Sequence, residues 1–252
     1  MTRLNQSKEL IRRVQEFLLQ RGGIEMKSSF LDTRLLLLYM RVVSLYKGVV
    51  VLLEARLAAE ALILIREMLI DSLHLMELAS REASSREALI LYELNETLTQ
   101  WQNLEKKKRS MREGAEKDAR LLDYVQSQKK EIENYRRLNR VGKLKYGSVK
   151  QLLEEHGRTD EYVDFEFVQA VVHRPFIAQL GREERDSQLH RIHLHDPDDR
   201  NLVNAGALAM TSALHARKAI SSIFGWTDTP PEQIDSLLAK IKVLPAEAPD
   251  ES

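Results

Sequence analysis

The sequence contains no cysteine. This absence excludes a disulfide scaffold, a metal site built on thiolates and a cysteine nucleophile, and it fits a reducing compartment. Glycine and proline are also scarce, with 10 and 6 residues in a chain of 252. Because an all-β fold needs these residues at its many turns, their scarcity favours helices.

The chain also lacks net charge, because 38 Lys and Arg residues balance 38 Asp and Glu residues. Such a chain has no global attraction to nucleic acid or to an anionic membrane. The N-terminus shows no secretory signal pattern, and charged residues interrupt the longest apolar run, Leu35 to Leu64. We therefore expect a cytoplasmic protein with no membrane partner.

Common catalytic signatures are missing as well. The sequence has no Walker loop, no GxGxxG, no GxSxG and no HExxH. What it does have is helical periodicity, with 43% hydrophobic and 30% charged residues. This combination is typical of a globular protein made of amphipathic helices.

The strongest helical signal runs from Glu54 to Arg81. At 100° per residue, its apolar residues fall on one broad face: Ala58, Ala61, Leu62, Ile65, Leu69, Ser72, Leu73, Met76 and Ala79. A line of ionisable residues falls on the opposite side: Arg56, Glu60, Glu67, Asp71 and His74. We predict an all-α multi-helix bundle around this central Ala/Leu-rich helix, at about residues 55–81.

Further helices are predicted on both sides of the central one. One ends near Gln20, a second starts at Asp32, and an Ala-rich helix spans Arg200 to Phe224. The charged stretch at about 100–140 predicts a protruding arm of two helices with a break near Gly114. We predict a single all-α domain at 1–226, followed by a short helix and a disordered tail at 227–252.

Three segments resemble a bacterial all-helical family known only as a domain of unknown function. They are ALILIREMLID, the stretch from Tyr162 to His173, and the late Ala-rich helix that ends in FGW. The resemblance covers about Leu31 to Trp226 and implies an all-helical fold and a bacterial stress or defence setting. It also implies an Arg-Glu pair on the central helix, here Arg66 and Glu67, and a helix that ends in a histidine, here His173.

The family often has a serine one turn before that histidine, where this chain has Gln169, which counts against a Ser–His pair. Arg66, Glu67 and His173 nevertheless form our first candidate site. They predict either a hydrogen-bonded network that sets helix register, or a small polar pocket in which His173 titrates near neutrality.

Two further groups suggest metal binding. Glu67, Asp71 and His74 share one helical face, which favours a solvated or salt-bridged face, then a polar site between helices, and last a dinuclear metal centre. The spacing is one that di-iron bundles use, but no matching second copy lies on another predicted helix. His190, His193 and His195 precede Asp196. In an extended segment, His193 and His195 would point to the same side and could bind zinc, or the cluster could be a chance feature of a polar loop.

Arg185 and His190 match the R-x4-6-H pattern of HEPN-type ribonucleases, which are helical proteins of bacterial defence and toxin systems. The resemblance implies that Arg185 holds a phosphate and His190 supports proton transfer during metal-independent RNA cleavage. In that family the motif lies on a buried helix at a dimer interface. Here it falls in a charged stretch that we predict to be irregular, with one extended piece at His190 to His195.

The favoured function is a helical interaction module, whose partner is another protein or a second copy of the chain. No cofactor is expected. The first alternative is a HEPN-like ribonuclease that acts on RNA, and the second is a metal-binding helical enzyme. Three results would separate these functions. RNA cleavage that persists in EDTA would indicate the ribonuclease, and a bound transition metal would indicate the metal-binding enzyme. Neither result would indicate the interaction module.

Overall fold

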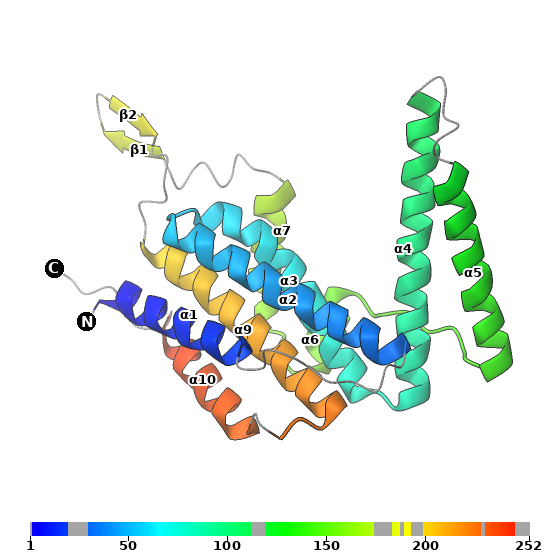
Figure 1. Cartoon of the computed structure of the whole chain (residues 1–252). Helices are drawn as coiled ribbons and strands as arrows, with labels where there is room; N and C mark the ends of the chain where they lie inside the picture. Colours follow the sequence, from blue (N-terminus) through cyan, green and yellow to red (C-terminus); the bar gives the residue numbers. More distant parts are fainter. Residues whose placement is uncertain are drawn as a thin grey trace. The chain divides into compact units, whose positions relative to one another are not determined.

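The computed structural model describes residues 2–19, 30–111, 119–173, 183–186, 189–192, 199–227 and 230–244. Its elements confirm the all-α prediction (Figure 1). The helices are α1 (Arg3–Leu19), α2 (Phe30–Glu54), α3 (Ala58–Ser80), α4 (Ala83–Met111), α5 (Ala119–Asn139), α6 (Val149–Glu155), α7 (Glu161–His173), α9 (Asp199–Phe224) and α10 (Pro231–Val243). Two short strands are β1 (Glu183–Asp186) and β2 (Leu189–Ile192).

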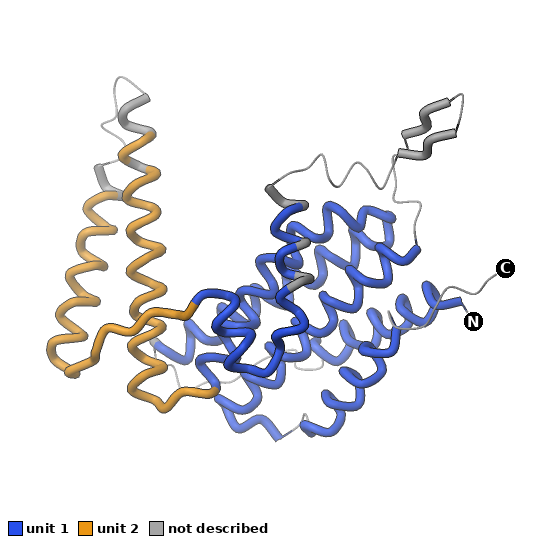
Figure 2. The backbone as a smooth tube through the Cα atoms, turned by 180° about the vertical axis from the view of Figure 1, so that it is seen from behind, with its two compact units in different colours: residues 1–79, 148–252 blue, residues 80–147 orange. Residues whose placement is uncertain are grey.

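The chain divides into two compact units (Figure 2). The first contains residues 1–79 and 148–252, and the second contains residues 80–147. The second unit includes both helices that the sequence predicts for the arm, α4 and α5. Gly114, the predicted break between them, lies outside the described residues.

The central helix α3 is buried along most of its length, as predicted. Its buried residues are Ala58, Ala61, Leu62, Ile65, Met68, Leu69, Asp71, Ser72, Leu73, Leu75, Glu77 and Leu78. A turn precedes α3, because α2 ends at Glu54 and Arg56 takes a positive φ of 59°. The Arg56 guanidinium then donates to Asp199, the first residue of α9, at 2.7 Å.

Helix α9 packs against α1, α2 and α10 because its alanines and glycine allow close approach. A Cβ atom on Gly206 would lie 3.0 Å from the Cδ1 atom of Ile11 in α1. Helix α9 is also tied to α3, since the Ser72 hydroxyl donates to the buried carbonyl of Ser212 at 2.8 Å. The apolar face predicted for α3 therefore includes one polar contact that orients it against α9.

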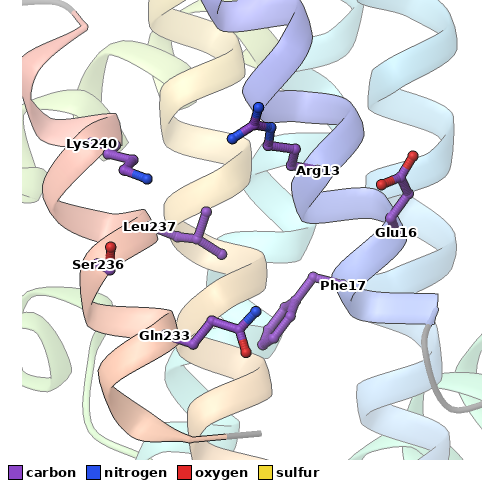
Figure 3. A pocket seen from close by; sticks show the side chains of 7 residues that line it. All are labelled: Arg13, Glu16, Phe17, Gln233, Ser236, Leu237 and Lys240. Carbon is purple, nitrogen blue, oxygen red and sulfur yellow. The ribbon is translucent and has the colours of Figure 1, made fainter.

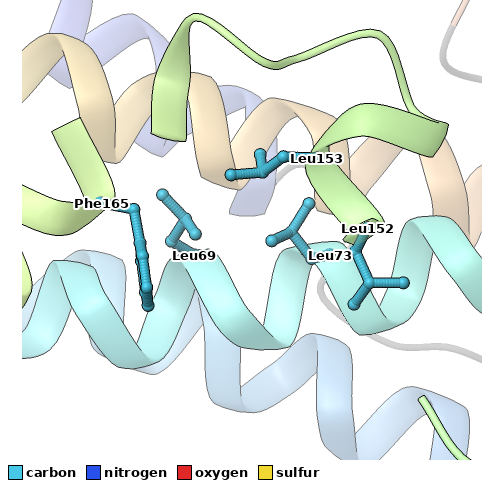
Figure 4. Close-up of a cluster of buried hydrophobic side chains, with 5 residues drawn as sticks. All are labelled: Leu69, Leu73, Leu152, Leu153 and Phe165. Carbon is cyan, nitrogen blue, oxygen red and sulfur yellow. The ribbon is translucent and has the colours of Figure 1, made fainter. Parts of the chain in front are cut away.

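A compact apolar cluster joins α3 to the short helices that follow the second unit in the chain (Figure 4). Leu69 and Leu73 of α3 meet Leu152 and Leu153 of α6 and Phe165 of α7. Helix α6 starts at a capping box, in which Ser148 and Gln151 each bond the other's backbone N–H. This cap orients a helix of only seven residues so that both its leucines reach α3.

The second unit has its own apolar seam. Leu91 and Leu98 of α4 pack on Val125 and Ile132 of α5, and all four are buried. The Lys129 ammonium adds a polar link, because it donates to Thr99 at 2.8 Å and to Gln102 at 3.0 Å. The few apolar residues of this charged stretch thus pack α4 against α5.

The segment that we predicted to be irregular forms a small antiparallel sheet of β1 and β2. Strand β2 overlaps the extended piece predicted at His190 to His195, and the unpredicted strand β1 pairs with it through backbone groups. His193, His195 and Asp196 lie outside the described residues, so zinc binding by these histidines stays a prediction.

One helix in the described part of the chain, Leu31–Glu54, is long and apolar enough to cross a membrane by length and composition alone. Core helices pass the same test, and this helix contributes Tyr39, Val42 and Tyr46 to the core. Only 39% of its most apolar window is buried inside the protein. Helix α2 is therefore a packed helix with one side left uncovered.

Candidate functional site

A line of charged and amide side chains connects α2, α3 and α7. The Arg66 guanidinium donates to the side-chain oxygen of Gln169 on α7 and, at 2.5 Å, to Glu67 Oε1. On the other side of Glu67, the Arg41 guanidinium of α2 donates to Glu67 Oε2 at 3.1 Å and to Asp71 Oδ1 at 3.1 Å. Arg41 therefore bridges two carboxylates that lie one turn apart on α3.

This network runs from solvent into the interior. The Arg41 side chain is 51% exposed and that of Glu67 is 40% exposed, whereas only 4% of the Asp71 side chain is exposed. A carboxylate loses its hydration when it is buried, so a nearby guanidinium is needed to keep it charged. Arg41 meets that need while half of its own side chain stays in contact with water.

Further ionisable side chains lie along α3 beyond Asp71, near residues that follow α6 and residues of α9. Burial, reinforced by the positive charge of Arg41, lowers the pKa of His74 to about 4. One turn further on, buried Glu77 lies 3.4 Å from the ring of His156. Burial and the nearby Arg158 lower the pKa of His215 on α9 to about 3, so both His74 and His215 are neutral at pH 7.

Arg158, which lies between α6 and α7 in the chain, is the next charged residue of this group. It is buried, its guanidinium bonds both carboxylate oxygens of Glu161, and it also donates to the sulfur of Met76 at 3.2 Å. The resulting link joins the start of α7 to α3. It holds the loop between α6 and α7 against the central helix.

The structure places the first candidate site only in part. Arg66 and Glu67 do form a hydrogen-bonded network, and Arg66 reaches α7 at Gln169, one turn before His173. His173 is the last residue of α7, and its side chain lies outside what the structure describes. A pocket that joins Arg66, Glu67 and His173 therefore stays a prediction.

The structure gives Glu67 and Asp71 a salt-bridged role. Within the described ranges, no group of three or more His, Asp or Glu side chains is arranged to hold a metal ion. The physical reason is that both carboxylates face the guanidinium of Arg41, which occupies the place a cation would take. The favoured role, a salt-bridged face, is thus what the structure shows for these two carboxylates.

Arg185 and His190 lie directly opposite each other in the register of β1 and β2. The HEPN resemblance implies a helix for this motif, and the structure gives a two-stranded ribbon instead. The pattern appears in the sequence because these two residues of paired strands stand five positions apart in the chain. This context counts against the ribonuclease alternative.

A second surface feature was missed at the sequence level. Four large apolar side chains are uncovered on the outer side of α2 and α3: Leu37 (54% exposed), Met40 (51%), Val51 (64%) and Ile63 (50%). We call this surface, together with the Arg41–Glu67 ion pair, the α2–α3 face. The signal was present in the sequence, because Leu37, Met40 and Val51 fall on the opposite side of the helix from Tyr39, Val42 and Tyr46, which are buried.

The exposed residues of α2 and those of α3 belong to one surface because the two helices lie side by side (Figure 1). Arg41 pairs with Glu67 and Asp71, and a Cβ atom on Gly48 would lie 2.8 Å from Leu64 Cδ1. These two contacts fix antiparallel helices whose outer sides are adjacent. Ile63 and Glu67 are one turn apart on α3, so the ion pair lies among the exposed apolar residues.

A separate cavity of about 340 Å³ lies between α1 and α10 (Figure 3). Phe17 and Leu237 give it apolar walls, and Arg13 and Lys240 stand at its edge. Arg13 and Lys240 also line a neighbouring hollow of about 370 Å³ near Val243. This groove has mixed polarity and holds none of the residues that the sequence singled out.

These features define an all-helical protein with a charged network and an exposed face on its central helices. Comparison with known proteins then identifies the family: a family model described as "Family of unknown function (DUF5677)" matches residues 32–170. The match covers more than half of the chain, so the chain belongs to this family. No match was found among curated proteins or among solved structures.

The match confirms the resemblance inferred from the sequence, with different limits. It contains Arg66, Glu67 and Gln169, but it ends before His173 and the late Ala-rich helix. The charged network from Arg41 to Asp71 thus lies wholly within the matched region. The bacterial stress or defence setting stays a prediction.

Proposed function

We propose that this protein is a cytoplasmic binding module that holds a protein partner on the α2–α3 face. The observation that carries the proposal is the uncovered apolar set Leu37, Met40, Val51 and Ile63 around the Arg41–Glu67 ion pair. Protein interfaces combine apolar and aromatic anchors with arginine, and clustered apolar exposure marks such surfaces more reliably than single exposed residues do.

The charged network supports the same proposal. Arg41 is held in one orientation by two carboxylates on α3, so little further side-chain entropy is lost when a partner packs on it. Catalytic use of the network has less support, because its ionisable groups are already bonded to one another. His74, which is partly buried and neutral, also has no acid–base role near pH 7.

Site-specific photocrosslinking in cells tests the proposal. A photoreactive residue is placed at Met40 or Ile63, and at the control position Val243, which is 54% exposed on α10. We expect the same protein to be captured from Met40 and Ile63 and not from Val243. The purified protein should then bind the wild-type chain and bind Met40→Lys at least about tenfold more weakly.

Two results would contradict the proposal. One is a captured protein that binds Met40→Lys as tightly as wild type. The other is RNA cleavage that persists in EDTA and is lost in Arg185→Ala or His190→Ala, which would put the ribonuclease alternative first. RNA cleavage that is lost in EDTA would instead support the second alternative, a metal-binding helical enzyme.

A further inference from the structure

We infer that the end of α5 and the loop that follows it, residues 137–145, bind the surface of an anionic lipid bilayer. We call this stretch the basic–leucine segment. It belongs to the second compact unit, residues 80–147, whereas the α2–α3 face belongs to the first. The inference therefore does not depend on the proposed function. It follows from the way in which positive charge and exposed leucine coincide in one short stretch.

The excess positive charge of the second unit is confined to this part of the chain. The unit contains 16 Lys and Arg residues and 11 Asp and Glu residues. Five of the basic residues fall between 136 and 145, where no acidic residue occurs, and the rest of the unit is balanced. The zero net charge of the whole chain thus contains a local excess, which can attract an anionic surface.

Four of these five basic side chains are accessible to a ligand. Arg137, Arg140, Lys143 and Lys145 are exposed, whereas only 8% of Arg136 is exposed. The expectation that the protein has no membrane partner rested on its net charge and on the interrupted apolar run. Neither argument applies to a local contact with the surface of a bilayer.

The loop is anchored at both ends within the second unit. Val141 packs on the apolar seam of α4 and α5, and its N–H donates to the carbonyl of Arg136 at 2.9 Å. The Lys145 ammonium lies 5.7 Å from the ring centre of Tyr92 on α4. Between these anchors, a Cβ atom on Gly142 would meet no heavy atom within 4 Å, so this part of the loop borders open space.

Two leucines of the segment stay exposed in spite of this anchoring. Leu138 is 77% exposed in the last turn of α5, and Leu144 is 41% exposed in the loop. Each has basic neighbours in the chain, because Arg137 precedes Leu138 and Lys143 and Lys145 flank Leu144. Amphipathic segments that enter the boundary between lipid headgroups and acyl chains combine leucine with cations in this way.

The leucines and the length of the segment select a bilayer over other anionic partners. Nucleic acid would use the cations through its phosphates, but its bases stack on aromatic rings, and residues 137–145 contain none. A stable protein interface uses about 20–30 residues on each side, which is more than this segment provides. An anionic bilayer offers headgroups to the cations and an apolar boundary to the leucines, and it needs no matching shape.

Flotation of the purified full-length chain with vesicles is the first test. We expect binding to phosphatidylcholine vesicles that contain about 30% phosphatidylserine, and at least about tenfold weaker binding to phosphatidylcholine alone. Equal binding to both kinds of vesicle, or binding to neither, would overturn the inference.

Charge variants show which cations carry the binding. Arg137→Gln/Lys143→Gln should bind the anionic vesicles at least about tenfold more weakly, because each cation near such a surface contributes about fivefold. Lys106→Gln/Lys107→Gln is the matched control, since it removes the same charge from exposed positions on α4. It should change the binding by less than about threefold. Equal losses in the two double variants would contradict the inference.

Leucine variants separate a bilayer from a polyanion. Leu138→Gln and Leu144→Gln should each weaken binding to the anionic vesicles at least about threefold, since each removes an apolar side chain from the lipid boundary. Leu104→Gln, at a position on α4 that is 59% exposed, should not. Suppose instead that both leucine variants bind the vesicles like wild type, and that a single-stranded RNA binds the wild-type chain but not Arg137→Gln/Lys143→Gln. The segment would then be assigned to nucleic acid, and the inference would be overturned.

A dye on the segment tests insertion directly, because the chain has no cysteine of its own. Leu144→Cys that carries a polarity-sensitive dye should shift its emission to the blue when anionic vesicles are added, and Leu104→Cys with the same dye should not. Vesicle binding that leaves the dye at Leu144 unshifted would show that another surface holds the bilayer.

Further results distinguish this inference from the proposed function. A protein that binds no vesicles but is still crosslinked to one partner from Met40 and Ile63 would overturn only the inference. Vesicle binding that is lost in Met40→Gln and kept in the segment variants would assign the bilayer to the α2–α3 face. That result would overturn both proposals.

Discussion

Arg41 and Asp71 form an ion pair across α2 and α3 in which the two partners have opposite environments. Their closest atoms are 3.1 Å apart, and the side chains are 51% and 4% exposed, respectively. A buried carboxylate is thus stabilised by a guanidinium that extends from the protein surface. The same guanidinium forms part of the α2–α3 face, so the residue that stabilises the core is also available to a partner.

Removal of this guanidinium should destabilise the protein more than loss of an ordinary surface ion pair. We expect Arg41→Met to lower the free energy of unfolding by about 1–3 kcal/mol, because Asp71 stays buried without it. Arg13→Met is the control, since Arg13 pairs with Glu9 at 2.9 Å on the exposed side of α1. It should cost less than about 1 kcal/mol. Urea unfolding measures both, and equal losses would contradict the special role of Arg41.

The assignment of buried and exposed residues on α3 can be tested by placing a carboxylate at one buried and one exposed position in turn. Leu69 is 1% exposed within the apolar cluster of α3, α6 and α7, whereas Ile63 is 50% exposed on the same helix. We expect Leu69→Asp to lose several kcal/mol of stability, since an unpaired carboxylate would enter the core. Ile63→Asp should stay folded. Circular dichroism during heating reads out both, and a Leu69→Asp melt like that of wild type would mean that the apolar face is assigned wrongly.

Stability should fall in mild acid because two partly buried histidines, His74 and His215, resist protonation. The pKa values of His74 and His215, about 4 and about 3, lie below the usual 6.5, mainly because burial disfavours the charged ring. The unfolded chain therefore binds more protons than the folded chain below about pH 6.5, so the free energy of unfolding decreases as the pH falls towards 4. Above that window the stabilisation is fully present.

Urea unfolding between pH 7.5 and pH 4.5 measures this dependence. The variants His74→Gln and His215→Gln should each show a shallower loss than wild type, whatever their stability at pH 7.5. Parallel curves for all three proteins would show that these histidines do not carry the effect.

Arg217 should tolerate even a conservative replacement poorly. Only 1% of Arg217 is exposed, and its guanidinium carbon lies 4.8 Å from the ring centre of Trp226, 5.8 Å from Phe17 and 5.9 Å from Tyr39. Lysine keeps the charge but not the flat guanidinium, so we expect Arg217→Lys to cost about 1–2 kcal/mol. Trp226 fluorescence during unfolding reports on this cluster. An unchanged unfolding midpoint for Arg217→Lys would show that the positive charge stabilises this cluster without the planar guanidinium.

Several local features were predictable because each depends on neighbours in sequence. The periodicity of α3 appears where expected, because the faces of a helix are determined over a few residues. The strand that pairs with β2 was missed, because EERD has no apolar alternation that would indicate a strand. Its pairing depends on the backbone of the neighbouring segment.

The charged network shows the limit of local reasoning. The spacing of Glu67, Asp71 and His74 placed them correctly on one helical face and favoured a solvated or salt-bridged face, without naming the partner charge. Only the position of α2 decides between these roles, because Arg41 comes from 26 residues away and reaches both carboxylates.

The sequence by itself determined the class of fold and the helices of the bundle, since these follow from periodicity and composition. The tertiary structure alone decided which charges neutralise one another, which histidines are buried and which side of α2 is left uncovered. These depend on helices brought together across long stretches of chain, where burial sets the strength of each electrostatic interaction.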